Sequence, residues 1–263
     1  MKERPSFPAR LDFSGSPVKS RAPLARVATV ASPASKPAAP LLASGLGLDS
    51  SAVRLNMVKK LAAQGITDSG VLDAMRAIER HRFVDSALVG QAYEDTSLPI
   101  GLGQTISKPG VVSRMIELLR QGTSVKLGRV LEIGTGCGYQ AAVLSQLAEE
   151  VYSIERLRGL HDKASDNLRH LHQANLHLLF GDGMLGYALG APYAGIIAAA
   201  GGEAVPQAWI DQLAMGGRLV APVSAGANSP GKQALVVIDK TPQGCKQTVL
   251  EAVHFVPLKS GLA

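Results

Sequence analysis

A short stretch near the middle of the chain combines glycines and acidic residues at spacings suited to ligand binding. Gly134, Gly136 and Gly138 follow an apolar run that contains Glu132, and Glu155 comes 17 residues after Gly138. Glycine allows a sharp backbone turn and the close approach of a ligand. An acidic side chain at the end of the next strand can accept hydrogen bonds from both hydroxyl groups of a ribose. The pattern therefore predicts a site for a ligand that contains a ribose.

The spacing of these glycines narrows the choice of ligand. A pyrophosphate-binding loop has the pattern G-x-G-x-x-G, whereas this loop reads G-x-G-x-G. The carboxylate of Glu132, buried beside the loop, would repel phosphate and suit a cationic ligand. S-adenosylmethionine carries a sulfonium, an ammonium and a ribose, and it has no phosphate. The pattern favours this methyl donor over a dinucleotide, and a tight strand–helix turn that binds nothing is a third interpretation.

A second glycine-rich stretch, GLGQTISKPG at residues 101–110, leads into a predicted helix. Ser107 stands where a helix N-cap belongs, and Pro109 occupies the first turn, where proline is tolerated. On one interpretation Ser107 only caps the helix. On the other, the glycine loop and the helix start together form a carboxylate site, because N–H groups at a helix N-terminus attract anions.

A third stretch places Asp182 between Gly181 and Gly183, directly after an apolar run at residues 176–180. Residues at the carboxyl ends of parallel strands face the ligand crevice of an open α/β sheet. Asp182 is therefore a candidate for ligand contact, and an ordinary turn aspartate is the alternative.

These stretches require elements that bring them together, and the hydrophobic pattern supplies such elements. Strands and helices alternate, which predicts an α/β fold with a mostly parallel, doubly wound sheet and helices on both faces. Two added helices come first, near residues 53–64 and 68–78. The predicted strands are residues 130–133, 151–154, 176–180, 194–200, 218–223, 234–239 and 248–256, and the later helices are residues 111–119, 140–148, 158–171 and 206–215.

Composition separates the first 47 residues from the rest. They are rich in Pro, Ala and Ser and lack any helical or strand period, which predicts a disordered basic extension. We expect residues 48–263 to form one domain, with N-terminal helices and a substrate loop in residues 48–110 and the donor-binding sheet and last strands in residues 111–263. Of 27 Lys/Arg and 21 Asp/Glu residues, 7 and 3 lie in residues 1–50. The domain is therefore near neutral, which argues against a nucleic-acid partner for it. For the extension, a basic arm touching nucleic acid is the alternative.

Other features exclude further classes of protein. No apolar run approaches the roughly 18 residues of a membrane span, so we expect a soluble protein without a membrane partner. Cys137 and Cys245 are too few for a disulfide framework, and a reducing cytoplasm fits best. The spacings of the histidines near the predicted helix at residues 158–171 do not match a usual metal pair. We therefore expect no metal site.

The chain resembles the protein-L-isoaspartate O-methyltransferase family in four segments, LPIGLGQTISKPGVVSRM, VLEIGTGCGYQAAVLSQLA, GDGMLGYALGAPYAGII and QLAMGGRLVAPV. The first two helices and the closing VHFVPL look similar as well, so the resemblance extends from about Leu55 to Leu258. The GQTIS segment is its most specific part. The chain departs from the family pattern in the extension before Ser51, in Glu79 where proline is usual, and in residues 198–202, which replace a threonine-containing run.

The resemblance implies a Rossmann-like methyltransferase fold and transfer of a methyl group from S-adenosylmethionine to the free α-carboxylate of isoaspartyl residues in damaged proteins and peptides. The ester then closes to a succinimide, whose hydrolysis can restore aspartate. A carboxylate has a reference pKa near about 4 and needs no general base. On this reading Ser107 orients the attacking carboxylate, with Thr105 and Ile106 beside it in the acceptor site.

The same resemblance assigns the donor site. The three glycines of the turn would run along the methionine part of S-adenosylmethionine, Glu155 would hold the ribose hydroxyls, and Asp182 and Gly183 would meet the adenine. Glu132, in the strand just before the turn, is a further candidate for donor binding. Two other functions are compatible with the chain: a methyltransferase with a different acceptor, and a donor-binding module without turnover. The intact GQTIS segment favours an enzyme, because a pure binding module has no use for an acceptor loop.

The composition of the extension yields a first prediction. Deleting residues 1–47 should leave the melting temperature and the rate of peptide methylation nearly unchanged, because that segment lacks the apolar content to pack. Thermal unfolding and a methyl-transfer assay of the truncated and full chains measure this. A marked fall in either quantity would show that the extension docks on the domain.

Overall fold

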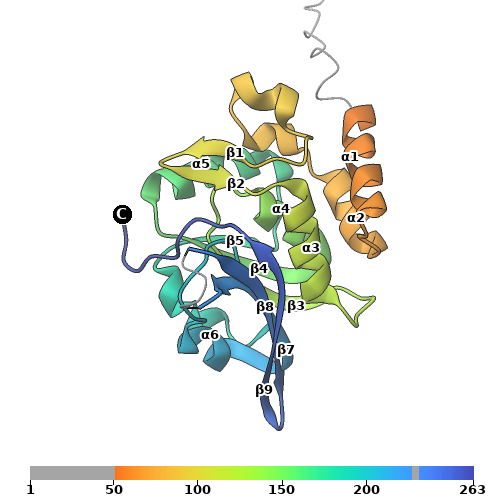
Figure 1. The fold of residues 1–263 in the computed structure, drawn as a ribbon. Helices are drawn as coiled ribbons and strands as arrows, with labels where there is room; N and C mark the ends of the chain where they lie inside the picture. Colours follow the sequence, from red (N-terminus) through yellow and green to blue (C-terminus); the bar gives the residue numbers. More distant parts are fainter. Residues whose placement is uncertain (1–50, 227–230) are drawn as a thin grey trace, which may run out of the picture. The chain divides into compact units, whose positions relative to one another are not determined.

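The computed structural model describes residues 51–226 and 231–263 (Figure 1). The extension predicted at residues 1–47 lies outside the described residues. The helices are α1 (Ser51–Ala63), α2 (Ser69–Ala77), α3 (Pro109–Arg120), α4 (Tyr139–Leu147), α5 (Arg158–Leu168) and α6 (Gln207–Gln212). The strands are β1 (Leu98–Gly101), β2 (Gln104–Ile106), β3 (Leu127–Ile133), β4 (Ala148–Glu155), β5 (Leu176–Phe180), β6 (Tyr193–Ala198), β7 (Leu213–Ser224), β8 (Gln233–Thr241) and β9 (Gly244–Val253).

The central sheet has the strand order β5-β4-β3-β6-β7-β8-β9. The neighbouring strands β5, β4, β3, β6 and β7 pair in parallel. Strands β8 and β9 add two antiparallel pairings at one side. The predicted mostly parallel sheet is confirmed. The chain runs outward from β3 to β5 and then returns to place β6 on the other side of β3. Such a reversal opens a crevice at the carboxyl ends of the strands, where ligands bind in folds of this kind.

Two apolar clusters, one on each face of the sheet, hold the central strands. Val130 of β3 belongs to a cluster with residues of α3, α4 and α5, and its neighbour Leu131 belongs to a second cluster with Trp209 of α6. Successive side chains of a strand point to opposite faces, so both faces of β3 are covered. This explains the unbroken apolar run in the sequence, and it confirms helices on both faces of the sheet.

The second helix is joined to α3 by a largely buried ion pair. The guanidinium Nε of Arg120, a side chain only 5% exposed, lies 2.8 Å from Asp68 Oδ2. The other oxygen of Asp68 accepts the N–H of Val71 at 3.1 Å and so caps α2.

Among the described residues, no helix is long and apolar enough to cross a membrane.

Three elements differ from the sequence-based expectation. Residues 98–106, expected as a loop, form the β1–β2 hairpin, in which Leu98 pairs with Ile106. The helix expected at residues 206–215 is shorter, because Leu213 already pairs with Tyr193 at the start of β6. The helix expected at residues 158–171 ends as α5 and continues as a 3₁₀ turn, Arg169–Leu171. Local periodicity could not reveal the early end of α6, because it depends on pairing with Tyr193, 20 residues earlier in the chain.

Candidate functional site

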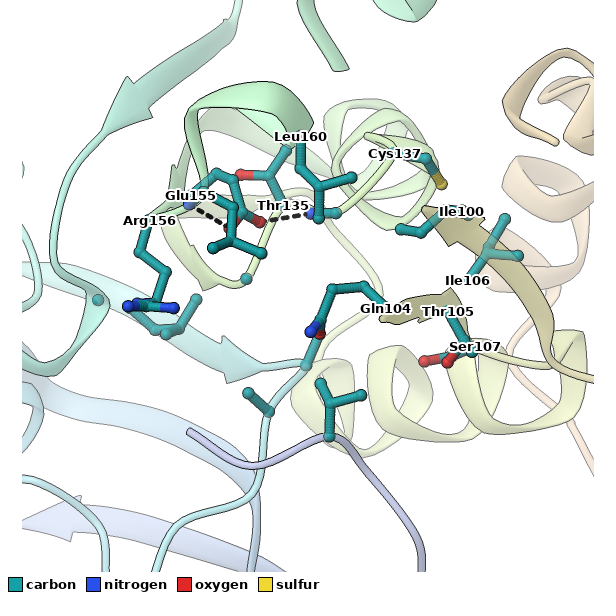
Figure 2. Close-up of a pocket in the computed structure, with 18 of the residues that line it drawn as sticks. Ile100, Gln104, Thr105, Ile106, Ser107, Thr135, Cys137, Glu155, Arg156 and Leu160 are labelled. Carbon is teal, nitrogen blue, oxygen red and sulfur yellow. Dashed lines mark hydrogen bonds between the residues drawn. The ribbon is translucent and has the colours of Figure 1, made fainter. Parts of the chain in front are cut away.

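A cavity of about 440 Å³ opens at the carboxyl ends of β3 and β4; we call it the main cavity. Figure 2 shows Glu155 on one side of it and Gln104, Thr105 and Ser107 on the other. Seven residues singled out from the sequence line it: Thr105, Ile106, Ser107, Gly134, Gly136, Glu155 and Gly183. Three others are absent from its lining: Glu132, Gly138 and Asp182.

The glycine turn between β3 and α4 follows a backbone path that side chains disfavour. Gly134, Gly136 and Gly138 have φ angles of 91°, 58° and 92°, in the left-handed region. A Cβ at Gly138 would also lie 2.8 Å from Leu168 Cδ1. Gly138 is the N-cap residue of α4, and the structure gives it a packing role against α5 in place of the expected ligand contact.

Glu155 holds this turn in place. Its Oε2 accepts a hydrogen bond from the Gly136 N–H at 2.9 Å, and its Oε1 accepts one from the Leu157 N–H at 2.9 Å (Figure 2). The side chain is 5% exposed, yet it lines the main cavity. Each carboxylate oxygen can accept more than one hydrogen bond. Glu155 can therefore support the turn and accept hydrogen bonds from a ligand at the same time.

Glu132 does not reach the main cavity, contrary to the expectation from the sequence. The side chain is fully buried in β3, and its Oε2 accepts a hydrogen bond from Ser153 Oγ. Ser153 Oγ lies 2.6 Å from Thr135 Oγ1 in the glycine turn. Burial raises the pKa of the Glu132 carboxyl to about 8, so it is mostly protonated at neutral pH. Glu132 thus supports the turn from beneath as a neutral group.

Asp182 is likewise turned away from the main cavity. Its Oδ1 accepts the N–H of Met184 at 2.9 Å, which is the turn-aspartate alternative. Its Oδ2 accepts the N–H of Gly261, 79 residues further along the chain, at 2.6 Å. The neighbouring Gly183 does line the cavity, and a Cβ there would lie 2.6 Å from Ile133 Cγ2. The absence of a side chain at Gly183 therefore lets this loop approach the end of β3.

The structure excludes the capping role considered for Ser107. Lys108 is the N-cap residue of α3, and Ser107 precedes it. The N–H of Gly110 donates to Asp95 Oδ1 at 2.7 Å, and Pro109 has no N–H. The start of α3 is therefore already occupied by Asp95, and a carboxylate site made of helix N–H groups is wrong as well. Within the described part of the chain, Ser107 Oγ has no hydrogen-bond partner.

A second cavity, of about 790 Å³, adjoins Ser107 from the other side. It lies between the first turns of α3, the Asp95 loop and the end of β9, and Lys108, Arg114 and His254 are among its lining residues. Of the residues that the structure describes, Ser107 alone lines both cavities. The free hydroxyl of Ser107 thus stands at the boundary between two hollows.

Several lining residues were not anticipated from the sequence. Arg156 and Leu157 directly follow Glu155, so their position at a strand end was a usable signal. Residues 256–259 come from beyond the last strand and gave no such signal. Residues 199 and 200, in the stretch that departs from the family pattern, also line the main cavity. The described residues contain no group of three or more His, Cys, Asp or Glu that could hold a metal ion.

Comparisons with known proteins agree on one family. A family profile described as Protein-L-isoaspartate(D-aspartate) O-methyltransferase (PCMT) matches residues 52–263. The chain is 56% identical over 267 residues to the Protein-L-isoaspartate O-methyltransferase of Methylibium petroleiphilum, covering 98% of this chain and 96% of that protein. It is 58% identical over 226 residues to the protein of the same name from Leptothrix cholodnii, covering 85% of this chain and 79% of that protein.

Solved structures show the same fold. A structure described as a protein-L-isoaspartate O-methyltransferase superposes with a TM-score of 0.71 at 27% identity, covering 80% of this chain and 67% of that one. A putative protein-L-isoaspartate O-methyltransferase from Plasmodium falciparum, in complex with S-adenosyl-L-homocysteine, gives a TM-score of 0.65 at 22% identity, covering 78% of this chain and 98% of that one.

The buried carboxyl beneath the turn yields a second prediction. The pKa of Glu132 is about 8 in the fold against a reference of 4.5, so the folded state holds an extra proton between these values. The free energy of unfolding must then fall as pH rises from about 4.5 to about 8. Glu132→Gln cannot ionise, and its stability relative to wild type should improve over that range by on the order of a few kcal/mol.

Urea unfolding of both proteins at pH 5, 6.5 and 8 measures this difference. The matched control is Glu149→Gln, which changes an exposed carboxylate of the adjacent strand β4. If the free energies of unfolding of wild type and Glu132→Gln changed with pH by the same amount, the assignment of Glu132 as a neutral, buried group would be contradicted.

Proposed function

The chain belongs to the protein-L-isoaspartate(D-aspartate) O-methyltransferase family, and we propose that its main cavity binds the methyl donor while Ser107 orients the acceptor. The protein is an S-adenosylmethionine-dependent methyltransferase that acts on isoaspartyl residues. The family resemblance and the fold expected from the sequence are confirmed. The roles of individual residues are our proposal, and they rest on the geometry described above.

The residues of the main cavity fit S-adenosylmethionine. Its volume of about 440 Å³ lies in the range of sites for small organic ligands. Gly134 and Gly136 present bare backbone, which suits the methionine part, and Glu155 presents fixed oxygens for the ribose hydroxyls. Gly183 lines the cavity at the proposed adenine end, with Asp182 behind it. The donor supplies a methyl group bonded to a positively charged sulfur.

The acceptor needs orientation more than it needs a base. A carboxylate is ionised at neutral pH, since its reference pKa is near about 4. Ser107 Oγ can donate a hydrogen bond to one carboxylate oxygen and leave the other free to attack. Alignment of this kind can lower a barrier by on the order of 7–11 kcal/mol. The observation that best supports this role is that Ser107 lines both cavities and that its hydroxyl makes no hydrogen bond within the described residues.

The second cavity supports a polypeptide acceptor. An isoaspartyl residue lies within a chain, so the neighbouring residues must leave the reaction site. The main cavity is taken by the donor in this proposal, and the second cavity of about 790 Å³ meets it at Ser107. Thr105 and Ile106 lie beside Ser107 on the hairpin side, where they would flank the acceptor.

Three further points are part of the proposal. Residues 48–263 would act as one methyltransferase domain, since the match to the family profile begins at residue 52. The free thiol of Cys245 is exposed, which suits a reducing cytoplasm. The near-neutral charge of residues 51–263 favours protein substrates over nucleic acid.

A third prediction concerns the donor. Glu155→Ala should raise the dissociation constant for S-adenosylmethionine at least tenfold, because two hydrogen bonds to a charged group are lost, each worth roughly 1.5–3 kcal/mol. Isothermal titration calorimetry measures the affinity, and circular dichroism checks that the variant is folded. Glu149→Ala, at the other end of β4, is the control. An unchanged affinity in folded Glu155→Ala would remove Glu155 from the ribose role.

A fourth prediction concerns Ser107. Because Ser107 does not cap α3, both Ser107→Ala and Ser107→Gly should keep native stability within about 0.5 kcal/mol and should keep donor affinity. Loss of one hydrogen bond to the reacting carboxylate should lower turnover roughly 10- to 100-fold. The assay compares methyl transfer to an isoaspartyl peptide with transfer to its aspartyl twin.

Thr105→Val is the matched control for Ser107, since it deletes a neighbouring hydroxyl of the same loop. Near-normal turnover in Ser107→Ala, with a large loss in Thr105→Val, would move the orienting role to Thr105. Equal transfer by wild type to the isoaspartyl and aspartyl peptides would contradict the proposed acceptor.

A further inference from the structure

Residues 257–263 run along the rim of the main cavity and are attached to it at two places. Pro257, Leu258 and Lys259 line the cavity. At the near end, the Leu258 N–H donates to the Gly201 carbonyl at 2.8 Å. At the far end, the segment reaches the loops that follow β4 and β5, which carry the residues proposed to hold the donor.

The attachment to the loop after β4 is a pair of backbone hydrogen bonds around Leu157. The Ala263 N–H donates to the Arg156 carbonyl at 2.9 Å, and the Arg158 N–H donates to the Ala263 carbonyl at 2.8 Å. The Arg156 side chain adds a third bond, from Nε to the Gly261 carbonyl at 2.7 Å. Both peptide groups that flank Leu157 are therefore fixed by the segment.

This attachment bears directly on Glu155. The Leu157 N–H, held between the two bonds to Ala263, is one of the two donors to the Glu155 carboxylate, at 2.9 Å. If residues 156–158 moved, Oε1 of Glu155 would lose its partner while Oε2 kept the bond to Gly136. The carboxylate could then rotate away from the orientation in which it faces the cavity.

The attachment to the loop after β5 is made through Asp182. The Gly261 N–H donates to Asp182 Oδ2 at 2.6 Å, while Oδ1 is used within the turn of Asp182 itself. One short segment thus holds both Asp182 and the backbone beside Glu155. These are the two acidic residues that the proposal places at the nucleoside end of the donor, Glu155 in the lining of the main cavity and Asp182 behind Gly183.

The far end of this segment is held by hydrogen bonds and buries little apolar surface. The side chain of Leu262 is 57% exposed, and residues 259–263 are all exposed. The last buried residue of the core is Phe255. Removing residues 261–263 would therefore leave the two apolar clusters intact and would change the rim of the cavity alone.

We propose that Gly261 and Ala263 are positioning residues of the donor site, which hold the 156–158 backbone and Asp182 so that the nucleoside end of the ligand meets a preformed site. This inference rests on the proposed donor site. A site that is not preformed must be ordered when the ligand binds, and that ordering weakens affinity. The effect should fall on the nucleoside and spare both the acceptor and the chemical step.

The test uses a truncation, a point variant and a matched control in the otherwise full chain. Deletion of residues 261–263 removes the bond to Asp182, the two backbone bonds of Ala263 and the bond from Arg156 Nε, and it leaves the contact of 3.5 Å between Arg156 Nη2 and the Ser260 carbonyl. Gly261→Pro removes the N–H that Asp182 accepts, and proline cannot adopt the φ of 76° found at Gly261. Leu262→Ala removes an exposed side chain and keeps all the backbone bonds. Thermal unfolding without ligand establishes that each variant is folded.

Calorimetric affinities for S-adenosylhomocysteine and for 5′-methylthioadenosine, which lacks the amino-acid part, locate the effect. We expect the deletion to weaken both ligands by a similar factor of about tenfold or more, and Gly261→Pro to weaken both by a smaller factor. Leu262→Ala should match wild type. The KM for an isoaspartyl peptide, and kcat with saturating donor, should stay within about twofold of wild type in all three variants.

Wild-type affinities in the folded deletion variant would overturn the inference, and so would a loss restricted to S-adenosylhomocysteine or an equal loss in peptide KM. If the deletion variant fails to unfold cooperatively, Gly261→Pro decides by the same criteria. Failure of the proposed donor site itself looks different, because the wild-type chain would then bind neither ligand.

Discussion

One carboxylate, that of Glu155, joins the turn after β3 to the loop after β4. The turn needs left-handed backbone at three glycines, and the Gly136 N–H within it would be unpaired without the bond to Glu155. Strands β3 and β4 pair in parallel, with Ile133 opposite Ile154. The end of β4, which carries Glu155, therefore lies beside the turn that follows β3. This contact fixes the part of the main cavity wall that the glycine turn and the end of β4 provide.

Beneath the turn, the same two strands supply a buried polar chain. Glu132, Ser153 and Thr135 connect β3, β4 and the turn, and each would be costly to bury without a partner. Burial keeps Glu132 neutral, so the chain adds support without placing a charge behind the ligand. Of the two glutamates Glu132 and Glu155, it is Glu155 that lines the main cavity and can meet a ligand.

The proposed acceptor side of the site comes from a different part of the chain. The β1–β2 hairpin and the residues before α3 place Ser107 against the main cavity, and Asp95 occupies the start of α3. The Lys163 ammonium of α5 donates to the Ile100 carbonyl at 2.9 Å and so joins the hairpin to α5. The proposed reaction site therefore lies where the β1–β2 hairpin and the start of α3 meet the sheet, and Ser107 lies at that border.

Local patterns in the sequence determined the alternation of strands and helices, the glycine turn, the acidic end of β4 and the family, because periodicity and turn chemistry act between near neighbours. Only the tertiary structure decided which polar groups were already engaged. Asp95, and not Ser107, occupies the start of α3. Asp182 bonds to Gly261, 79 residues away, and Glu132 is neutral because folding removes it from water. These outcomes depend on partners and burial that folding brings together, and no spacing in the sequence encodes them.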